Sequence, residues 1–343
     1  MRNCRIAVVG ATGAVGQVFL DIVQQRKFPA SQIRLCASAR SVGKKVTVNG
    51  EQIAIEVATP KLFSEVDIVF IAAGSDISKA MAPIAVEKGA VVVDKSSAFR
   101  MDPNCALVVP EVNGDDLVGH KGITSVPNCS TTPLVMVLKP LNDRLKVRRV
   151  IADTYQSVSG TGVEAIDELR TQTAQIVKGE PVTKQVYPHQ IAFNLFPHIE
   201  TFKENGYTTE EIKMTMESRK ILHLPNLAVS ATCVRVPVMV SHSESVHIDF
   251  EGRITPDEVR KILSNAPGIK VVDDPSKGVY PTPLMAEGKD EVFVGRIRED
   301  ASNPNGIAMW LVSDNLRKGA ALNGIQIAEE LLRRDLVGRK ARV

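Results

Sequence analysis

Aromatic residues are scarce in this sequence, and so are long apolar runs. Of its 343 residues, 4% are aromatic and 44% are hydrophobic. That is enough to bury a core, but no stretch approaches the roughly 20 apolar residues of a membrane-spanning helix. The opening residues, MRNCRIAVVGATG, pass from an apolar stretch directly into glycines and lack the cleavage region of a signal peptide. The sequence therefore indicates neither a membrane-spanning nor a secreted protein.

Paired cysteines are missing as well. The five cysteines are odd in number and scattered, without a CxxC pair, so the sequence predicts neither a disulfide framework nor a metal site. Free thiols favour a reducing, cytoplasmic location. The cysteines are Cys4, Cys36, Cys105, Cys129 and Cys233.

The chain also lacks an excess of charge of either sign. Its formal net charge is +3, and no nucleic-acid-binding motif accompanies the basic residues. This argues against a nucleic-acid partner, although a local site for an anion remains open.

Two patterns divide the sequence, whose length suits about two domains. The first part alternates strand-like apolar runs with helical periodicity, which indicates a parallel sheet covered on both faces. The predicted strands are residues 4–10, 33–38, 66–74 and 90–99, and the predicted helices are 13–28 and 78–89.

The pattern changes at about residue 148. Residues 148–157 and 233–252 alternate apolar and polar side chains, as expected of an antiparallel sheet with one solvated or functional face. Helices are predicted over 162–179, 255–263 and 318–336, and Thr255 is the expected N-cap of the second.

A glycine loop follows the first predicted strand. VVGATGAVG places Gly10, Gly13 and Gly16 between that strand and a helix, where glycines let the backbone approach a pyrophosphate and the helix N-terminus supplies N–H donors. The spacing is GxxGxxG rather than GxGxxG, so the order of strand, loop and helix carries the prediction. A tight turn without a ligand is the alternative.

The end of the second predicted strand bears on the cofactor. An NAD site usually has an acidic residue there, which accepts a hydrogen bond from the ribose 2′-hydroxyl. CASARSVGKK has none, and its Ser38, Arg40 and Ser41 suit a 2′-phosphate. We therefore predict NADP, with an exposed basic loop as the alternative.

Cys129 differs from the other cysteines in its surroundings. In VPNCSTTP it lies among polar residues at the start of a predicted helix, whose N-terminus stabilises a thiolate and so favours a nucleophile. A buried structural thiol is the alternative. Cys4, Cys36 and Cys233 fit that description, because each lies in or beside a strand-like run.

An acid/base and a cation follow in RVPVMVSH. Arg235 and His242 flank a predicted strand end and a turn, so both can reach one cleft. Histidine is the usual acid/base near neutral pH. Taken alone, His242 fits a structural role better.

Eight segments in order resemble the aspartate-semialdehyde dehydrogenase family, and together they cover nearly the whole chain. So many ordered matches make the resemblance specific. The segments are GATGAVG (10–16), SSAFRMD (96–102), VVPEVN (108–113), PNCSTTP (127–133), YQSVSGTG (155–162), QIAFNLFPHI (190–199), RVPVMVSHSESV (235–246) and DNLRKGAALNGIQIAE (314–329). One departure is Ser241, where the family often has glycine.

The resemblance implies reduction of aspartyl 4-phosphate to aspartate 4-semialdehyde with NADPH, in the diaminopimelate, lysine, threonine, methionine and isoleucine pathways. By resemblance, Cys129 displaces phosphate to form a thioester, and hydride transfer then gives a thiohemiacetal that collapses to the aldehyde. His242 matches the family's acid/base, and Gln156 matches a residue that orients the substrate.

The same resemblance assigns the remaining site residues. Arg235 matches the residue that holds the α-carboxylate, Glu217 would hold the α-amino group, and Lys220, Arg100 and Asn128 match phosphate ligands. A solvated surface pair is the alternative for Glu217 and Lys220. The implied cofactor contacts are Gly10, Thr12, Gly13, Ala14, Val15, Gly16, Ser38, Arg40, Ser41, Gly74, Ser75, Ser159, Gly160 and Asn315.

The predicted fold class is α/β, with a Rossmann-like dinucleotide-binding domain and an α+β catalytic and dimerisation domain whose sheet is mainly antiparallel or mixed. The first domain is expected over 1–129 and 320–343, and the second over 130–319. A homodimer is expected by resemblance, and QIAFNLFPHI suits either its interface or a core strand.

Three other functions share part of this chemistry or fold. N-acetyl-glutamyl-phosphate reductase shares the chemistry and the cofactor, but its acylated substrate has no use for Glu217. Glyceraldehyde-3-phosphate dehydrogenase has a different motif around the cysteine. A catalytically silent NADP-binding sensor would need none of Cys129, Gln156, Arg235 and His242.

Overall fold

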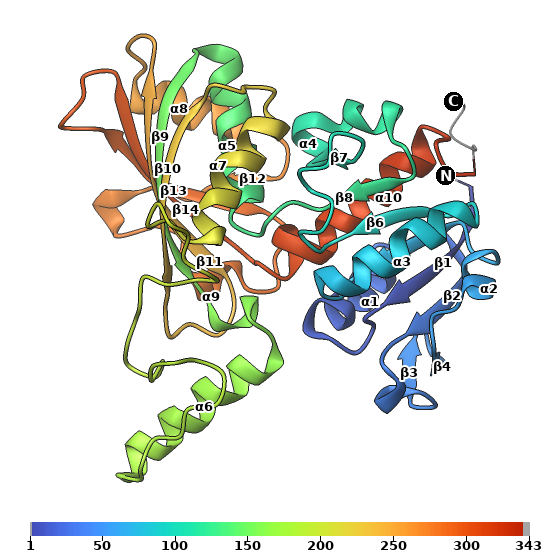
Figure 1. Ribbon diagram of the computed structural model, residues 1–343. Coiled ribbons are helices and arrows are strands. Elements are labelled where there is room, and N and C mark those ends of the chain that lie inside the picture. The colour runs from blue at the N-terminus through green and yellow to red at the C-terminus, as the bar shows by residue number, and fades with distance from the viewer. Residues whose placement is uncertain (1, 339–343) are drawn as a thin grey trace. The chain divides into compact units, whose positions relative to one another are not determined.

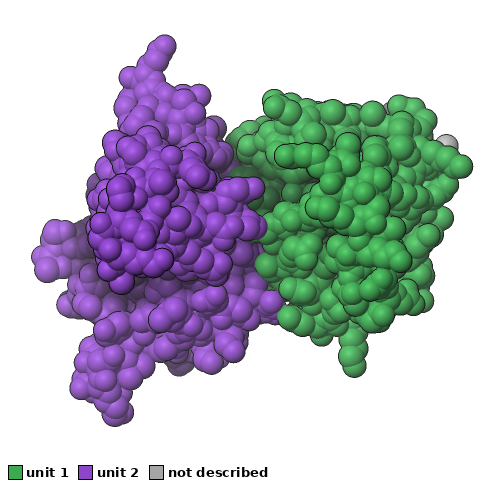
Figure 2. Space-filling model, turned by 90° about the horizontal axis from the view of Figure 1, so that it is seen from below, with its two compact units in different colours: residues 1–127, 320–343 green, residues 128–319 purple. Residues whose placement is uncertain are grey.

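The computed structural model describes residues 2–338, and the chain forms two compact units (Figures 1 and 2). The first unit comprises the chain up to Pro127 and again from Ala320 onwards, and the second is Asn128–Gly319. The boundary expected from the sequence follows residue 129, and the chain is expected to return at residue 320. Among the described residues, no helix combines the length and apolar character that crossing a membrane requires.

An eight-stranded sheet forms the centre of the first unit (Figure 1). Its order is β3-β4-β2-β1-β5-β6-β8-β7, and the neighbouring strands are parallel except for β3 and β4. The strands are β1 (Cys4–Val9), β2 (Ala30–Cys36), β3 (Lys45–Val48), β4 (Glu51–Glu56), β5 (Ile68–Ile71), β6 (Val91–Asp94), β7 (Ala106–Leu107) and β8 (Ile123–Ser125). Because β2 and β5 lie on opposite sides of β1, the strand order reverses at β1.

Helices cover both faces of this sheet. Side chains alternate along β1, so Ile6 and Val8 join the core that contains residues of α1 and α10, whereas Ala7 and Val9 join the core beneath α2 and α3. The prediction of a parallel sheet buried on both faces is confirmed. The helices of this unit are α1 (Ala14–Gln25), α2 (Pro60–Phe63), α3 (Ser75–Glu87), α4 (Pro110–Asn113) and α10 (Leu322–Arg333).

A six-stranded mixed sheet forms the second unit, in the order β10-β9-β11-β14-β13-β12. The strands are β9 (Val147–Gln156), β10 (Ala228–Arg235), β11 (His242–Phe250), β12 (Ile269–Val271), β13 (Val292–Glu299) and β14 (Gly306–Ser313). The helices are α5 (Thr131–Arg144), α6 (Val163–Lys178), α7 (Thr209–Ile221), α8 (Pro256–Ser264) and α9 (Pro283–Ala286).

The alternating run 233–252 forms two strands rather than one. It contains the end of β10 and all of β11, and residues 236–241 form the loop between them. β10 is parallel to β9, whereas β11 is antiparallel to it. The alternation of apolar residues continues through the loop, which is why periodicity did not reveal the break.

One face of the second sheet is more open than the other. Along β9 and β11, the buried residues alternate with partly exposed ones such as Tyr155 and His247. The predicted sheet with one solvated face is therefore confirmed. Thr255 is the N-cap of α8 as expected, and its hydroxyl and Glu258 form a capping box.

α7 lies beside the edge strand β10 and covers its free backbone groups. Glu211 accepts a hydrogen bond from the Cys233 N–H at 3.0 Å, and Arg219 donates one to the Leu227 carbonyl at 2.8 Å. The helix begins with a capping box between Thr208 and Glu211. These contacts help to stabilise α7 beside β10. Two further glutamates of this helix, Glu210 and Glu217, hydrogen-bond to Asn128, which precedes Cys129.

Candidate active site

The glycine loop closes the end of β1 in the first unit. Gly10 has a φ of +86°, a conformation that favours glycine. A Cβ on Gly16 would lie 2.3 Å from the Gly10 carbonyl oxygen, so Gly16 has no room for a side chain. A Cβ on Gly13 would lie 3.5 Å from the same oxygen, which is an ordinary contact. Packing within the protein therefore requires glycine at 10 and 16 but not at 13.

The other predicted cofactor contacts of the first unit follow neighbouring strands. Ser38 and Arg40 come after β2, where Arg40 is exposed, and Gly74 is the N-cap of α3 after β5. The Gly10 N–H donates to the Cys36 carbonyl at 2.9 Å, which ties the glycine loop to the end of β2. Ligands of such sheets bind at the carboxyl ends of the strands where the strand order reverses.

The remaining predicted cofactor contacts of this unit lie in the same loops and at the start of α1. Ser41 ends the turn Ala39–Ser41, and the Ser75 hydroxyl lies 3.1 Å from that of Ser97. Thr12 belongs to the glycine loop, and Ala14 and Val15 begin α1.

Arg100 also belongs to the first unit, in the turns that follow β6. Its side chain is buried, and its Nη2 donates to the Lys95 carbonyl at 2.8 Å. Asp94 orders the same segment, because its carboxylate accepts hydrogen bonds from the N–H and the hydroxyl of Ser96 at 2.9 and 2.8 Å. The guanidinium is thus held by its own loop.

Cys129 is the most accessible of the five cysteines. It is half-buried, whereas the other four are buried. Burial raises the pKa of Cys4 and of Cys36 to about 12, and it also raises the pKa of Cys233. These three thiols stay protonated and unreactive near neutral pH, and their predicted burial is confirmed.

Asn128 ties the cysteine loop to the start of α5. Its Oδ1 accepts hydrogen bonds from the Ser130 N–H at 2.8 Å and from the Thr131 N–H at 3.3 Å, where α5 begins. Its own N–H donates to Oε2 of Glu217 at 2.7 Å, and its Nδ2 donates to Oε1 of Glu210 at 2.8 Å. Cys129 therefore directly follows a residue that two carboxylates of α7 anchor.

Gly319, in a π-helical turn over Arg317–Ala321, packs closely against Cys129. A Cβ on Gly319 would lie 2.9 Å from the Cys129 Cβ and 3.2 Å from its carbonyl oxygen. Glycine at 319 therefore permits the close approach of the two segments. π-helical turns frequently occur at functional sites.

The side chain of Gln156 is held at both ends of its amide. Thr154 Oγ1 donates to Oε1 of Gln156 at 3.0 Å, and Nε2 of Gln156 donates to Oε1 of Glu210 at 3.0 Å. Gln156 is the last residue of β9 and is buried. Glu210 thus contacts two predicted site residues, Asn128 and Gln156.

His242 begins β11 and is held through Nδ1. The Ser157 N–H lies 3.0 Å from Nδ1, and the Ser157 hydroxyl lies 3.1 Å from it. A backbone N–H can only donate, so Nδ1 accepts, and the neutral ring carries its proton on Nε2.

Arg235 and His242 lie against the same glycine. A Cβ on Gly160 would lie 3.3 Å from both Nη1 of Arg235 and Nε2 of His242. Nη1 of Arg235 also donates to the Ser157 carbonyl at 2.6 Å. The structure therefore brings together the cation and the imidazole that the sequence placed on either side of a turn.

Asn315 hydrogen-bonds to two loops, one that contains Ser159 and one that contains Ser241. Its Oδ1 accepts hydrogen bonds from the Ser241 N–H at 2.9 Å and from the Ser159 hydroxyl at 3.1 Å, and its Nδ2 donates to the Ser159 hydroxyl at 2.9 Å. Ser241 has a φ of +73°, which glycine adopts without strain. This conformation explains why glycine suits the position before His242.

Glu217 and Lys220 both belong to α7. Glu217 is 1% exposed, so the two residues are not the solvated surface pair considered as an alternative. The carboxylate of Glu217 instead contacts the backbone of the cysteine loop through Asn128.

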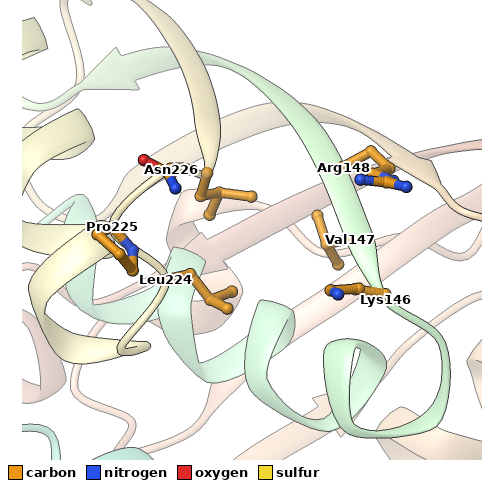
Figure 3. A pocket seen from close by; sticks show the side chains of 7 residues that line it. Lys146, Val147, Arg148, Leu224, Pro225 and Asn226 are labelled. Atoms are coloured by element: carbon orange, nitrogen blue, oxygen red, sulfur yellow. The ribbon is translucent and has the colours of Figure 1, made fainter.

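A separate pocket of about 320 Å³ lies elsewhere in the second unit (Figure 3). None of the predicted site residues lines it. Arg148, one of its two basic residues, pairs with Glu251 at 2.8 Å and is largely exposed. Its lining residues are Lys146, Val147, Arg148, Leu224, Pro225, Asn226 and Leu227.

Three residues that contact Asn128, Cys129 or Gln156 were not singled out in the sequence analysis: Thr154, Glu210 and Gly319. A signal for Glu210 was present, because TTEEIKMTMES reads as a capping box followed by a helix. Glu210 precedes Glu217 by about two helical turns, so both lie on one face of the helix. No local signal pointed to Thr154 or Gly319.

The fold defines a class of protein in which a dinucleotide-binding unit accompanies a mixed-sheet unit, here one that holds a half-buried thiol. Residues 5–120 match the family model described as "Semialdehyde dehydrogenase, NAD binding domain". Residues 138–318 match the model described as "Semialdehyde dehydrogenase, dimerisation domain". The first match indicates a nicotinamide cofactor.

Three similar proteins, each aligned over nearly its full length, carry the name aspartate-semialdehyde dehydrogenase. The chain is 50% identical to an aspartate-semialdehyde dehydrogenase of Aquifex aeolicus, with 97% of this chain and 99% of the relative aligned. It is 48% identical to the Bacillus subtilis protein of that name, over 98% of this chain and 99% of the relative. The crystal structure of aspartate-semialdehyde dehydrogenase II from Vibrio cholerae in complex with ASA matches with a TM-score of 0.95 at 42% identity, over 97% of this chain and 99% of that chain. The chain belongs to the aspartate-semialdehyde dehydrogenase family.

Proposed function

We propose that the protein reduces L-aspartyl 4-phosphate to L-aspartate 4-semialdehyde with NADPH and releases phosphate. The observation that carries the proposal is Cys129, a half-buried thiol at the start of α5 whose loop Asn128 anchors. The names of the full-length relatives support the same reaction.

In this reaction Cys129 acts as the nucleophile. Its thiolate attacks the acyl carbon, phosphate leaves, and a thioester remains on the sulfur. NADPH, when bound, supplies the hydride that reduces the thioester. The resulting thiohemiacetal then collapses to the aldehyde and releases the thiolate.

His242 assists through Nε2. Because Nδ1 accepts the Ser157 N–H, the neutral ring presents a donor at Nε2. A donor of this kind stabilises the oxygen that becomes negatively charged in each tetrahedral intermediate. The hydrogen bond therefore favours the donor half of the acid/base role expected from the resemblance.

Charged residues are proposed to hold the substrate. Arg235 would bind the α-carboxylate, because a guanidinium pairs with a carboxylate bidentately. Glu217 would hold the α-amino group, although one of its oxygens already accepts the Asn128 N–H. Lys220 and Arg100, together with Asn128, would bind phosphate. Gln156 would orient the acyl group.

The cofactor is proposed to be NADP. The glycine at position 13 is not required by packing, which leaves room for a pyrophosphate at the N-terminus of α1. The exposed Arg40 suits a 2′-phosphate. A related structure from Candida albicans, 27% identical, is described as containing NADP.

A homodimer is proposed as the working form. The second unit matches a domain described as a dimerisation domain. Within QIAFNLFPHI, Phe193 is 70% exposed and Leu195 is 56% exposed, whereas Ile191 and Phe196 are buried. The segment thus offers apolar surface to a partner as well as anchoring itself. Sedimentation showing a monomer at working concentration would refute the dimer.

The test of the proposed function is turnover of L-aspartate 4-semialdehyde with NADP and phosphate, followed by the appearance of NADPH. N-acetyl-glutamate 5-semialdehyde is assayed in parallel. Turnover of the first substrate alone supports the proposal. Turnover of the acetylated substrate alone would assign the chain to the sister reductase, and binding of NADP without turnover of either would favour a sensor.

A further inference from the structure

Glu210 links two predicted site residues that are far apart in the sequence. Its Oε1 accepts a hydrogen bond from Nδ2 of Asn128 at 2.8 Å and one from Nε2 of Gln156 at 3.0 Å. Its Oε2 lies 3.4 Å from Nζ of Lys213. The residue is 3% exposed, so water does not compete freely for these contacts.

These contacts determine which atom each amide presents. Thr154 donates to Oε1 of Gln156, and Glu210 accepts from its Nε2. A hydroxyl donor at one end and a carboxylate at the other permit only one of the two orientations of the amide. Without the carboxylate, the amide of Gln156 loses the partner that keeps Nε2 in place.

The second contact acts on the cysteine loop. With Nδ2 held by Glu210, the Oδ1 of Asn128 faces the N–H of Ser130 at the start of α5. This hydrogen bond keeps Cys129 next to the N-terminus of the helix, where a thiolate is stabilised. One carboxylate therefore fixes the residue that precedes the nucleophile and the amide at the end of β9.

We propose that Glu210 is a positioning residue, which acts as a shared acceptor that sets the orientation of Asn128 and Gln156 around Cys129. This role rests on the proposed function for its kinetic consequence. The carboxylate of Glu210 does not itself contact the substrate in this proposal.

Two neutral variants isolate the acceptor. Glu210→Gln keeps an oxygen that can accept from both amides, whereas Glu210→Met removes the acceptor at similar length, and both remove the charge. We expect kcat to fall about 3- to 10-fold in Glu210→Gln, since a neutral acceptor forms a weaker hydrogen bond. In Glu210→Met we expect kcat to fall about 100-fold, because two buried donors lose their partner. NADPH affinity should stay unchanged in both.

Glu211→Gln is the matched control. Glu211 is the neighbouring buried glutamate, but its contacts are the helix cap and the Cys233 N–H. This variant should lower the melting temperature and leave kcat unchanged. If Glu210→Met behaves in the same way, Glu210 is merely structural and the proposal fails. If Glu210→Gln is as slow as Glu210→Met, the charge matters rather than the acceptor, and the proposal also fails.

Alkylation of Cys129 by iodoacetamide gives a readout that needs no substrate. The two variants carry the same charge, so the pH midpoint of alkylation should lie higher in Glu210→Met, where Asn128 is no longer held. Equal midpoints would contradict the positioning role. A wild-type protein that fails to oxidise the semialdehyde would refute the proposed function alone, because the alkylation result would still decide the role of Glu210.

Discussion

In the first unit the glycine loop is shaped by close approach of backbone to backbone, whereas in the second unit the cysteine loop is held by side-chain hydrogen bonds. Gly16 lies where a Cβ would be 2.3 Å from a carbonyl oxygen. Asn128, in contrast, owes its position to Glu210, Glu217 and the start of α5.

The difference teaches where each site is sensitive. A backbone loop tolerates changes in neighbouring side chains but not a Cβ at the contact itself. A side-chain network responds to the loss of any single acceptor, because a buried donor is then left without a partner. The two regions should therefore fail in different ways. Three experiments test this, and a fourth concerns a buried carboxyl of the second unit.

The largest expected effect is a loss of turnover without a loss of cofactor binding. Cys129→Ala should abolish turnover of the semialdehyde, because no thioester can form, while NADPH still binds with unchanged affinity. Steady-state assays and cofactor titration by fluorescence measure the two quantities. Loss of NADPH binding in this variant would show that Cys129 also affects cofactor binding. Residual turnover would refute the role of Cys129 as the nucleophile.

A Cβ beside the nucleophile should have the next largest effect. In Gly319→Ala the new methyl group would lie 2.9 Å from the Cys129 Cβ, so either the cysteine loop or the turn at Gly319 must shift. A displacement of this kind can cost about 100-fold in kcat.

The control for that variant is Gly119→Ala. Apart from its own neighbours in the chain, no atom of residues 2–338 lies within 4 Å of a Cβ at Gly119, so kcat should not change. Equal kcat values in the two variants would show that the cysteine loop absorbs the added methyl group.

Two glycines of the first unit should differ in their role: one is required by packing within the protein, and the other leaves room for a ligand. Gly16→Ala should destabilise the protein by about 1–3 kcal/mol, since the Cβ overlaps backbone atoms. Gly13→Ala should leave the melting temperature close to that of the wild type and weaken NADPH binding, because the space at Gly13 is proposed to serve the pyrophosphate. Thermal unfolding and cofactor titration are the measurements. Normal NADPH affinity in Gly13→Ala would argue against a pyrophosphate at this loop.

The smallest effect concerns Glu244, which is 1% exposed and whose carboxylate oxygens have no hydrogen-bond partner in residues 2–338. Burial raises the pKa of this carboxyl well above its ordinary value of 4.5. The folded state therefore holds the proton more tightly than the unfolded chain does. The contribution of Glu244 to stability is fully present below pH 4.5 and is lost as the pH rises towards the folded-state pKa.

Replacing this carboxyl should therefore stabilise the folded protein most at high pH. Glu244→Gln should raise the melting temperature by a few degrees at pH 8, and by less at pH 5. The exposed Glu51→Gln is the matched control and should show no such difference. A melting-temperature gain for Glu244→Gln that is the same at both pH values would contradict a raised pKa.

Local patterns predicted the parts of the site that depend on neighbours in the chain. The order of strand, glycines and helix predicted the loop at Gly10–Gly16, and the polar surroundings of Cys129 predicted its place at the start of a helix. The alternation over 233–252 was less informative, since the apolar spacing continued through the loop that separates β10 from β11. Ser241 illustrates the same limit, because a φ of +73° at a serine has no signature in its own residue type.

The sequence by itself determined a glycine loop that follows a strand and a thiol at a helix start, because each depends on residues within one helix or strand of each other. Only the tertiary structure decided what surrounds that thiol. In the sequence, Glu210 is 82 positions from Asn128 and 54 positions from Gln156. Gly319 and Cys129 lie near opposite ends of the sequence of the second unit, yet they contact each other. Such contacts arise when α5 packs against both β9 and α7, and the spacing of residues along a single segment carries no record of them.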